Sequence, residues 1–284
     1  MALEKVHKIL EMAEQAHTSV MAYICIDYNM VYSAITIAEE LQKPVIIMLL
    51  PEHCITYNVA GVAGFAAMVR ELALGVKVPV GLHLDHSSDY AYIIRAVQQG
   101  FPSVMIDGSM FPYEENIRLT KKVCEAAHVL GADVEAELGH VGLAMDDAAC
   151  QEEFYTNPET AASFCTETGV DSLTVAIGNA HGTYKKSPRL DIERLVEIDR
   201  ATDVPLVLHG GSGIPDDQLK QAFAKGINKF NVGTEYLACY YKSMEEYVKM
   251  HEGEEDPLCM LGFSGYAQER LMEYLRKKMS LSGL

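Results

Sequence analysis

Eight short apolar runs, separated by longer amphipathic stretches, limit the fold of this chain more than any other feature of its sequence. Each run is apolar at successive positions, which is typical of a parallel sheet that is buried on both faces. We expect strands at residues 21–26, 45–49, 80–84, 103–107, 132–138, 171–177, 204–209 and 228–233. Helical periodicity predicts helices at residues 30–42, 58–74, 88–99, 113–130, 158–168, 191–201, 216–225 and 234–250.

Eight strand–helix units in about 250 residues predict an α/β fold, a closed (β/α)8 barrel of the TIM type. An open doubly wound sheet is the alternative, but no Gly-x-Gly-x-x-Gly motif follows the first strand. We expect a single domain over residues 1–284. An extra helix precedes the first strand, and residues 251–284 form a C-terminal helical extension with a helix near 266–279.

The charge limits the partners that the protein can bind, and the cysteine content indicates its compartment. The formal net charge is −17, so the surface repels nucleic acids and anionic membranes, and a phosphate must be held by a local arrangement of groups. No apolar run reaches the about 18 residues of a membrane span, and the amphipathic N-terminus is unlike a signal peptide. Seven cysteines without regular spacing indicate reduced thiols in a cytoplasmic protein.

Three histidines, His86, His181 and His209, each follow a predicted strand. The C-terminal ends of barrel strands converge on one face, so these side chains are expected to lie close together. Neutral imidazoles suit a catalytic zinc ion with one open position, and cobalt or iron fits the same ligands. Each histidine could instead be structural. Asp107 and Glu137 are expected to orient the imidazoles, or else to form an ordinary polar rim.

A glycine-rich run, Gly-Gly-Ser-Gly at residues 210–213, follows His209 and precedes a predicted helix. Glycines allow backbone amides to approach an anion closely, and a helix N-terminus favours negative charge. The loops after strands seven and eight commonly carry the phosphate site of such barrels. We therefore expect a phosphate site here, completed by Ser212, Thr234 and Lys185.

Several segments together resemble the class II, zinc-dependent ketose-bisphosphate aldolases, which include the fructose- and tagatose-bisphosphate aldolases. They are HLDH, DGS, VEAELGHVG, AIGNAHGTYKKSPRLD, VPLVLHGGSGIPDDQ and NKFNVGTE. The resemblance extends over residues 3–250 and is most specific over 79–236. It implies a barrel that forms a homodimer or homotetramer, with one Zn²⁺ per subunit and a small ketose phosphate as substrate.

The resemblance also implies roles for individual residues. His86, His181 and His209 become the zinc ligands, and Asp85 becomes the catalytic acid/base. Asn231 would contact the substrate near its reacting carbons. The 1-phosphate would bind among Gly182, Lys185, Gly210, Ser212 and Thr234. The implied reaction is reversible cleavage of the C3–C4 bond to give dihydroxyacetone phosphate and an aldehyde.

Three positions depart from the family pattern at the distal end of the substrate. Ile24, Leu50 and Leu237 stand where relatives carry polar or charged groups that meet the distal phosphate. A phosphate dianion against three aliphatic side chains would lack hydrogen bonds and a counter-charge. We therefore expect an aldehyde without that phosphate. The alternatives are a displaced alignment in this region or a substituting cation, and a monovalent cation is held open as a second cofactor.

A fourth departure lies in the loop after the fifth strand, where relatives carry a glutamate that assists proton transfer. Here the position falls on Met145. Either Asp146 or Asp147 reaches the site in its place, or the second proton transfer is weakened by about 10²- to 10⁴-fold. Two alternative functions stay open. One is an aldolase for another ketose phosphate, of the deoxy-keto-gluconate phosphate type. The other is a non-catalytic protein that binds zinc and a sugar phosphate, although the intact Asp85 argues against it.

Overall fold

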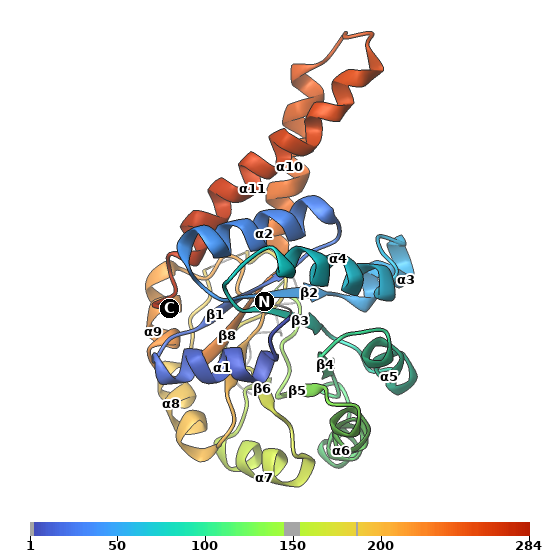
Figure 1. The fold of residues 1–284 in the computed structure, drawn as a ribbon. Helices are drawn as coiled ribbons and strands as arrows, with labels where there is room; N and C mark the ends of the chain where they lie inside the picture. The colour runs from blue at the N-terminus through green and yellow to red at the C-terminus, as the bar shows by residue number, and fades with distance from the viewer. Residues whose placement is uncertain (1–2, 145–153, 186) are drawn as a thin grey trace.

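The computed structural model describes residues 3–144, 154–185 and 187–284. Its eight strands are all parallel and close into a barrel in sequence order, with β1 paired to β8 (Figure 1). The strands are β1 (Val20–Ile24), β2 (Val45–Leu49), β3 (Val80–Leu84), β4 (Ser103–Ile106), β5 (Asp133–Leu138), β6 (Ser172–Val175), β7 (Leu206–Leu208) and β8 (Ile227–Val232). The predicted (β/α)8 barrel is confirmed.

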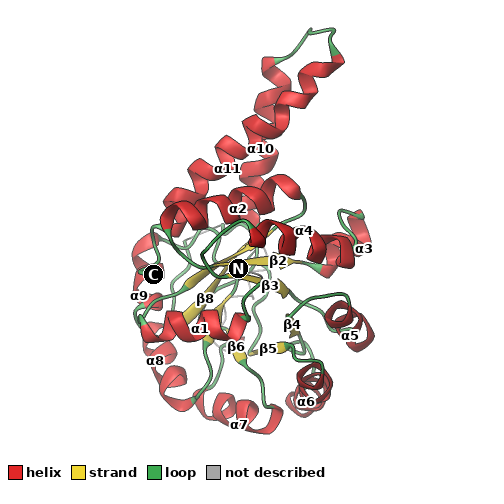
Figure 2. Cartoon of the chain, viewed as in Figure 1, coloured by secondary structure: helices red, strands yellow, loops and turns green. Residues whose placement is uncertain are grey.

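Helices surround the strands (Figure 2). They are α1 (Val6–Gln15), α2 (Tyr28–Leu41), α3 (Pro51–Tyr57), α4 (Val62–Leu74), α5 (Tyr90–Gln98), α6 (Tyr113–Val129), α7 (Pro158–Thr168), α8 (Ile192–Ala201), α9 (Asp216–Phe223), α10 (Thr234–Met250) and α11 (Phe263–Met279). Side-chain caps fix several starts, since Asp27, Asp89, Asn157 and Asp191 each accept a hydrogen bond from a backbone N–H of the first turn. None of these helices combines the length and the apolar composition that a membrane span requires.

The helix predicted over residues 58–74 is present as α4 and ends at Leu74 as expected, but it starts later, and the short helix α3 before it was not predicted. The chain turns into α3 directly after β2, because Pro51 occupies the first position of a helix that its fixed φ angle favours. Asn58, with a φ angle of 52°, then ends α3, and α4 begins at Val62. The short helix α3 brings its side chains to the C-terminal face of the barrel.

Strands six and seven end earlier than expected because a side chain replaces their ladder partners. The Asn179 Oδ1 atom accepts a hydrogen bond from the Ile177 N–H at 2.8 Å. Its Nδ2 atom donates to the His209 carbonyl at 3.1 Å. The residues between the strand ends and these contacts therefore leave the sheet and turn over the barrel.

The expected N-terminal helix is α1, which packs its apolar stripe against the barrel. Val6, Ile9 and Leu10 form a buried cluster with inward-facing residues of β1 and β2, among them Ala22 and Ile46. Gly81 of β3 leaves room for this contact, because a Cβ atom there would lie 3.1 Å from the Val6 and Ile46 side chains.

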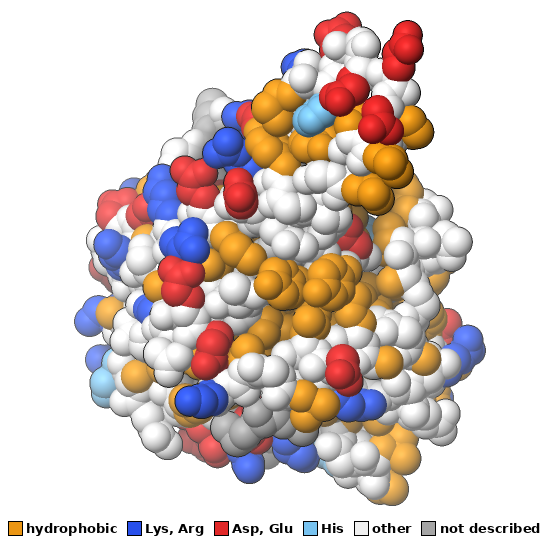
Figure 3. All heavy atoms as spheres, turned by 45° about the horizontal axis from the view of Figure 1, so that its top comes forward, with side chains coloured by type: hydrophobic (Ala, Val, Ile, Leu, Met, Phe, Trp, Pro, Cys, Tyr) orange, Lys and Arg blue, Asp and Glu red, His pale blue; other side chains and the backbone are white. Residues whose placement is uncertain are grey.

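The C-terminal region forms a hairpin of α10 and α11 that extends beyond the barrel (Figure 1). A 3₁₀ helix, η2 (Pro257–Gly262), precedes α11, which begins at Phe263 where the sequence predicted 266. Exposed apolar side chains gather on the protruding part of the hairpin (Figure 3); they include Met244, Val248, Met250, Leu258, Met260 and Leu261. The base of α11 packs along α2, where Arg276 pairs with Glu40 at 2.7 Å.

Candidate metal and substrate site

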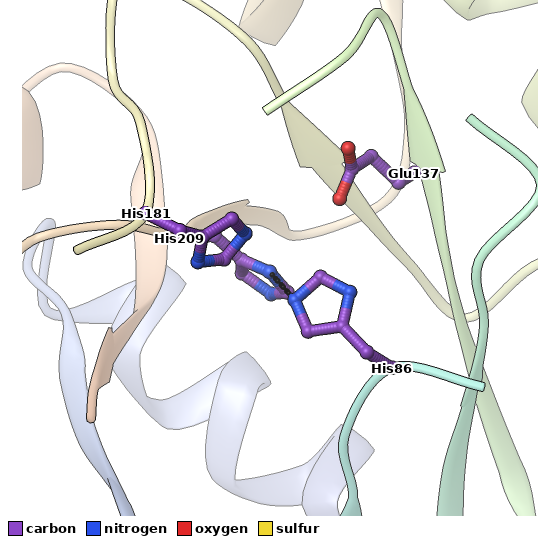
Figure 4. Close-up of side chains that lie close together, drawn as sticks. All are labelled: His86, Glu137, His181 and His209. Atoms are coloured by element: carbon purple, nitrogen blue, oxygen red, sulfur yellow. Dashed lines mark hydrogen bonds between the residues drawn. The ribbon is translucent and has the colours of Figure 1, made fainter. Parts of the chain in front are cut away.

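The three histidines converge at the C-terminal face of the barrel, each from the segment that follows a strand (Figure 4). The Nε2 atom of His86 lies 2.9 Å from the Nδ1 atom of His209. The ring centroid of His181 lies 4.9 Å from that of His86 and 5.8 Å from that of His209. Nitrogen atoms of all three rings are thus close enough to share one ion.

The carboxylate of Glu137 joins this cluster. One ligand atom from each of His86, Glu137, His181 and His209 lies within 4.8 Å of the others. The Glu137 Oε1 atom accepts a hydrogen bond from the Val141 N–H at 2.9 Å, whereas Oε2 is buried and has no partner among the described residues. Burial and the charge of Asp107 raise the pKa of Glu137 to about 8. The sequence assigned Glu137 to orientation only, but its unpaired oxygen could also serve as a ligand.

Asp107 contacts the His86 ring directly. Its Oδ2 atom lies 2.8 Å from His86 Nδ1, and its Oδ1 atom accepts hydrogen bonds from the Ser109 N–H and hydroxyl. Although burial opposes the change, the carboxylates of Asp85 and Asp107 raise the pKa of His86 to about 10. A site with this much negative charge around an imidazole attracts positive charge. A divalent cation would balance this negative charge as a proton does. The donor set of three imidazoles and one carboxylate fits zinc.

A layer of buried polar side chains, Glu135, Asn231 and Lys229, lies on the Nε2 side of the His209 ring. Its Nε2 atom lies 2.9 Å from Glu135 Oε1 and 2.9 Å from Asn231 Nδ2. The other oxygen of Glu135 accepts a hydrogen bond from Lys229 Nζ at 2.6 Å, and Glu135 and Lys229 are both almost fully buried. This layer leaves the Nδ1 atom of His209 facing the cluster.

Sequence reasoning missed Glu135 and Lys229, although a signal for both was present. Alternate residues of a strand point to the same side, so Glu135 shares a side of β5 with Glu137, and Lys229 shares a side of β8 with Asn231. A lysine within an otherwise buried strand predicts an acidic partner across the barrel, because a buried charge must be paired.

Asp85, which follows β3, is buried and lines the cavity beside His86. The Nδ2 atom of Asn231 donates to Asp85 Oδ1 at 3.2 Å. Burial favours the neutral acid, but the charges of His86 and His209 outweigh it and hold the pKa of Asp85 below its usual value. The carboxyl group is therefore ionised at neutral pH and able to accept a proton.

One cavity of 450 Å³ connects these groups with the glycine-rich loop. Gly210, at a φ angle of 63°, passes so close to the Ala180 carbonyl that a Cβ atom would lie 2.2 Å from its oxygen. Of the expected phosphate-binding residues, the cavity wall contains Gly182, Gly210, Ser212 and Thr234, and it also contains Asn231, which was expected near the reacting carbons. Lys185 does not belong to the described wall of this cavity.

Ile24, Leu50 and Leu237, the three residues expected at the distal end of the substrate, also line this cavity. Ile24 fills the space above Gly233, where a Cβ atom would lie 2.8 Å from its Cδ1 atom. His53 of α3 is a further wall residue, which sequence analysis missed together with the helix that carries it. Met145, Asp146 and Asp147 lie outside the described residues.

Comparison with known proteins identifies the class of protein that this barrel and its metal-ligand cluster define. The family model for class II fructose-bisphosphate aldolase matches residues 4–284. A curated relative, the D-tagatose-1,6-bisphosphate aldolase subunit GatY of Klebsiella oxytoca, is 42% identical over 222 residues, which are 78% of this chain and 77% of that protein.

Solved structures agree with this result. The crystal structure of the YdjI aldolase from Escherichia coli K12 has a TM-score of 0.86 and 34% identity, covering 99% of this chain and 97% of that one. The fructose-bisphosphate aldolase of Campylobacter jejuni shares the fold, with a TM-score of 0.82, 23% identity and coverage of 99% and 95%. The chain belongs to the class II fructose-bisphosphate aldolase family. It is a metal-dependent aldolase, a carbon–carbon lyase of carbohydrate metabolism.

Proposed function

We propose that this aldolase uses zinc to cleave a ketose 1-phosphate or ketose bisphosphate into dihydroxyacetone phosphate and an aldehyde that lacks the usual distal phosphate. One observation carries the proposal: a single cavity is lined by Asp85, by His86 and His181 of the histidine cluster, by residues 210–212 of the glycine-rich loop and by three aliphatic side chains. The alternative of a non-catalytic binding protein does not agree with membership of an aldolase family.

Four residues around the cavity would bind the metal, and a fifth would orient one of them. His86, His181 and His209 would hold the zinc ion, with Glu137 in reach as a fourth ligand. Zinc in that position supplies a Lewis acid for the oxygens of the ketose. Asp107 fixes the orientation of His86, as carboxylates beside metal-binding histidines commonly do.

Asp85 would act as the base in the cleavage direction. Its ionised carboxylate accepts the proton of the C4 hydroxyl, the C3–C4 bond breaks, and the aldehyde departs. The bonding electrons remain on the dihydroxyacetone phosphate half, which takes up a proton at C3. Asn231 holds one carboxylate oxygen of Asp85 and so orients the base. For the second proton transfer, Asp146 and Asp147 are the candidates in the loop after β5, and a weakened transfer is the alternative.

The substrate's 1-phosphate would bind at the loop of residues 210–213 with Gly182 and Thr234. The positive φ angles of Gly182, Gly210 and Gly213 support this assignment, because they are backbone conformations that other residues rarely adopt. Lys185 stays a predicted contributor, and a monovalent cation stays a candidate second cofactor.

The distal wall of Ile24, Leu50 and Leu237 favours a neutral aldehyde. A dianion placed there would lose its hydration without gaining the hydrogen bonds that Ser, Asn or Arg would offer. A ketose phosphate of the deoxy-keto-gluconate type would need a cation for its carboxylate, and these three side chains offer none.

A condensation screen tests the proposal. The zinc-loaded protein is mixed with dihydroxyacetone phosphate and one of four aldehydes: glyceraldehyde 3-phosphate, glyceraldehyde, lactaldehyde or malonate semialdehyde. We expect a neutral aldehyde to react fastest, with no reaction in the Asp85→Ala variant. A clear preference for glyceraldehyde 3-phosphate would contradict the assignment of the distal wall. Binding without any reaction would contradict the proposed chemistry.

We also propose an oligomeric state, a compartment and a class of partner. The enzyme would be a homodimer or homotetramer in the cytoplasm, acting on small sugar phosphates and not on nucleic acids or membranes. The six described cysteines are all free thiols, which supports a reducing compartment. Size-exclusion chromatography with light scattering measures the oligomer.

A further inference from the structure

The glycine-rich loop is tied to α10 by one residue, Glu235. Its Oε1 atom accepts a hydrogen bond from the Gly213 N–H at 2.6 Å. Its own backbone N–H donates to the Ser212 hydroxyl oxygen at 3.1 Å. Side chain and backbone of Glu235 thus hold two consecutive residues of the loop that lines the cavity.

The second oxygen of the same carboxylate is held by the C-terminal helix. Lys278 Nζ lies 2.9 Å from Glu235 Oε2, and the Tyr274 hydroxyl donates to that oxygen at 2.9 Å. Both residues belong to α11. Burial works against the charge of Glu235, but the hydrogen bond and charge of Lys278 keep its pKa below the usual value. One carboxylate therefore connects α11 with the loop.

Lys278 supports the loop by a second route. Its ammonium group lies 5.6 Å from the centroid of the Phe230 ring. Phe230 in turn lies directly beneath Gly211, where a Cβ atom would come within 1.9 Å of the ring. The side chain of Lys278 is only 9% exposed, so the ammonium group is largely shielded from solvent, although Glu235 is 30% exposed.

The position of α11 is itself fixed by contacts on both sides of Lys278. Arg276 pairs with Glu40 of α2 through two hydrogen bonds of 2.7 Å. Beyond the helix, the Ser282 hydroxyl donates to the Ser19 carbonyl at 2.7 Å. The helix can therefore act as a rigid support for Glu235.

Charge explains why a lysine is needed. Glu235 alone would place a negative charge beside a loop that has to accept a phosphate dianion, in a chain whose net charge is already −17. A buried ammonium group within hydrogen-bond distance neutralises that carboxylate, which can then orient the Gly213 amide without repelling the ligand.

We propose that Glu235 is a positioning residue for the substrate phosphate, and that Lys278 and Tyr274 of α11 hold it in place and balance its charge. This inference rests on the proposed binding of phosphate by residues 210–213. None of the three residues touches the substrate in this account. They act through the Ser212 hydroxyl and the Gly213 backbone amide.

The test compares the wild-type protein with Lys278→Met, Lys278→Arg, Tyr274→Phe and Glu235→Gln. Lys277→Met is the matched control, because Lys277 is the exposed neighbour of Lys278 on α11. For each metal-loaded protein, calorimetry gives the Kd for dihydroxyacetone phosphate and for dihydroxyacetone, which lacks the phosphate. Condensation kinetics give kcat and the KM for dihydroxyacetone phosphate.

We expect Lys278→Met and Glu235→Gln to weaken binding of dihydroxyacetone phosphate about tenfold, the effect of one charge-assisted hydrogen bond. KM should rise by the same factor, whereas kcat changes by less than about twofold. Tyr274→Phe should have a smaller effect in the same direction. Lys278→Arg should retain most of the affinity, and Lys277→Met should behave as the wild type. Binding of dihydroxyacetone should not change in any variant.

The proposed phosphate site and the proposed role of α11 would be rejected by different results. If the wild-type protein binds dihydroxyacetone phosphate no more tightly than dihydroxyacetone, the proposed phosphate site is wrong. If the wild type prefers the phosphate but folded Lys278→Met and Tyr274→Phe bind it as tightly as Lys277→Met, the role of α11 is wrong. An equal loss for dihydroxyacetone and its phosphate would also reject it, since that pattern indicates a general structural defect.

Discussion

The Nε2 atom of His86 lies 2.9 Å from the Nδ1 atom of His209, although the two residues are 123 positions apart in the sequence. The two nitrogens face each other because Asp107 holds the far side of one ring and the Glu135–Asn231 layer holds the far side of the other. Two imidazoles fixed in this way present adjacent nitrogen atoms to one point.

Replacement of His209 by alanine should abolish stoichiometric metal binding, because it removes a ligand and leaves Glu135 and Asn231 without their common partner. The metal content of protein dialysed against zinc, measured by plasma mass spectrometry, should fall well below that of the wild type. His251→Ala is the control, since His251 lies at the end of α10, away from the cavity. Equal metal content in the two variants would contradict the assignment.

Asp107→Asn should weaken metal binding by about 10- to 100-fold, the usual cost of losing a carboxylate behind a metal-binding histidine. Competition with a chelator of known affinity measures the change. Asp171→Asn is a matched control, because Asp171 pairs with His128 at the same distance of 2.8 Å, outside the cavity. A similar affinity for metal in both variants would show that Asp107 does not orient His86.

Asp85→Asn should lower kcat by about 10²- to 10⁴-fold, because the amide cannot accept the proton of the C4 hydroxyl. Metal content and the Kd for dihydroxyacetone phosphate should remain near the wild-type values. Asp89→Asn is the control: it lies in the same loop and caps α5, a role that asparagine fulfils equally well. Substantial turnover by Asp85→Asn would assign the base to another residue.

Leu237→Arg should shift the aldehyde preference toward glyceraldehyde 3-phosphate. A guanidinium group on the cavity wall provides the counter-charge that the aliphatic wall lacks, so the ratio of kcat/KM for this aldehyde over glyceraldehyde should rise about tenfold or more. Tyr241→Arg adds the same charge on the exposed face of α10 and should leave the ratio unchanged. An unchanged ratio in Leu237→Arg would place the distal end of the substrate elsewhere.

Glu235 should contribute to stability in a pH-dependent manner. Its pKa in the folded protein lies below the ordinary value of 4.5, so its contribution is fully present above about pH 4.5 and is lost as the pH falls through the lowered folded pKa. The difference in unfolding free energy between the wild type and Glu235→Gln should therefore be largest near neutral pH and shrink in acid. Denaturant titrations at several pH values measure it, and a difference that stays constant with pH would contradict this contribution.

The sequence by itself determined the architecture and the family. Eight buried strands alternating with amphipathic helices are local patterns, and parallel strands joined by helices have few ways to close, so the (β/α)8 barrel followed from them. The motifs around His86, His181 and His209 determined the aldolase family, because the spacing of rare residues is itself written in the sequence.

The tertiary structure decided the contacts between residues that are distant in the chain. Hydrophobic periodicity does not report which buried charges meet, so the Lys229–Glu135 pair and the Lys278–Glu235–Gly213 connection appeared only in the fold. The same reason explains the early ends of β6 and β7, where the Asn179 side chain replaces strand partners from two different segments. Pattern and propensity act over a few neighbouring residues, whereas the partners of a buried polar group are set by the closure of the whole barrel.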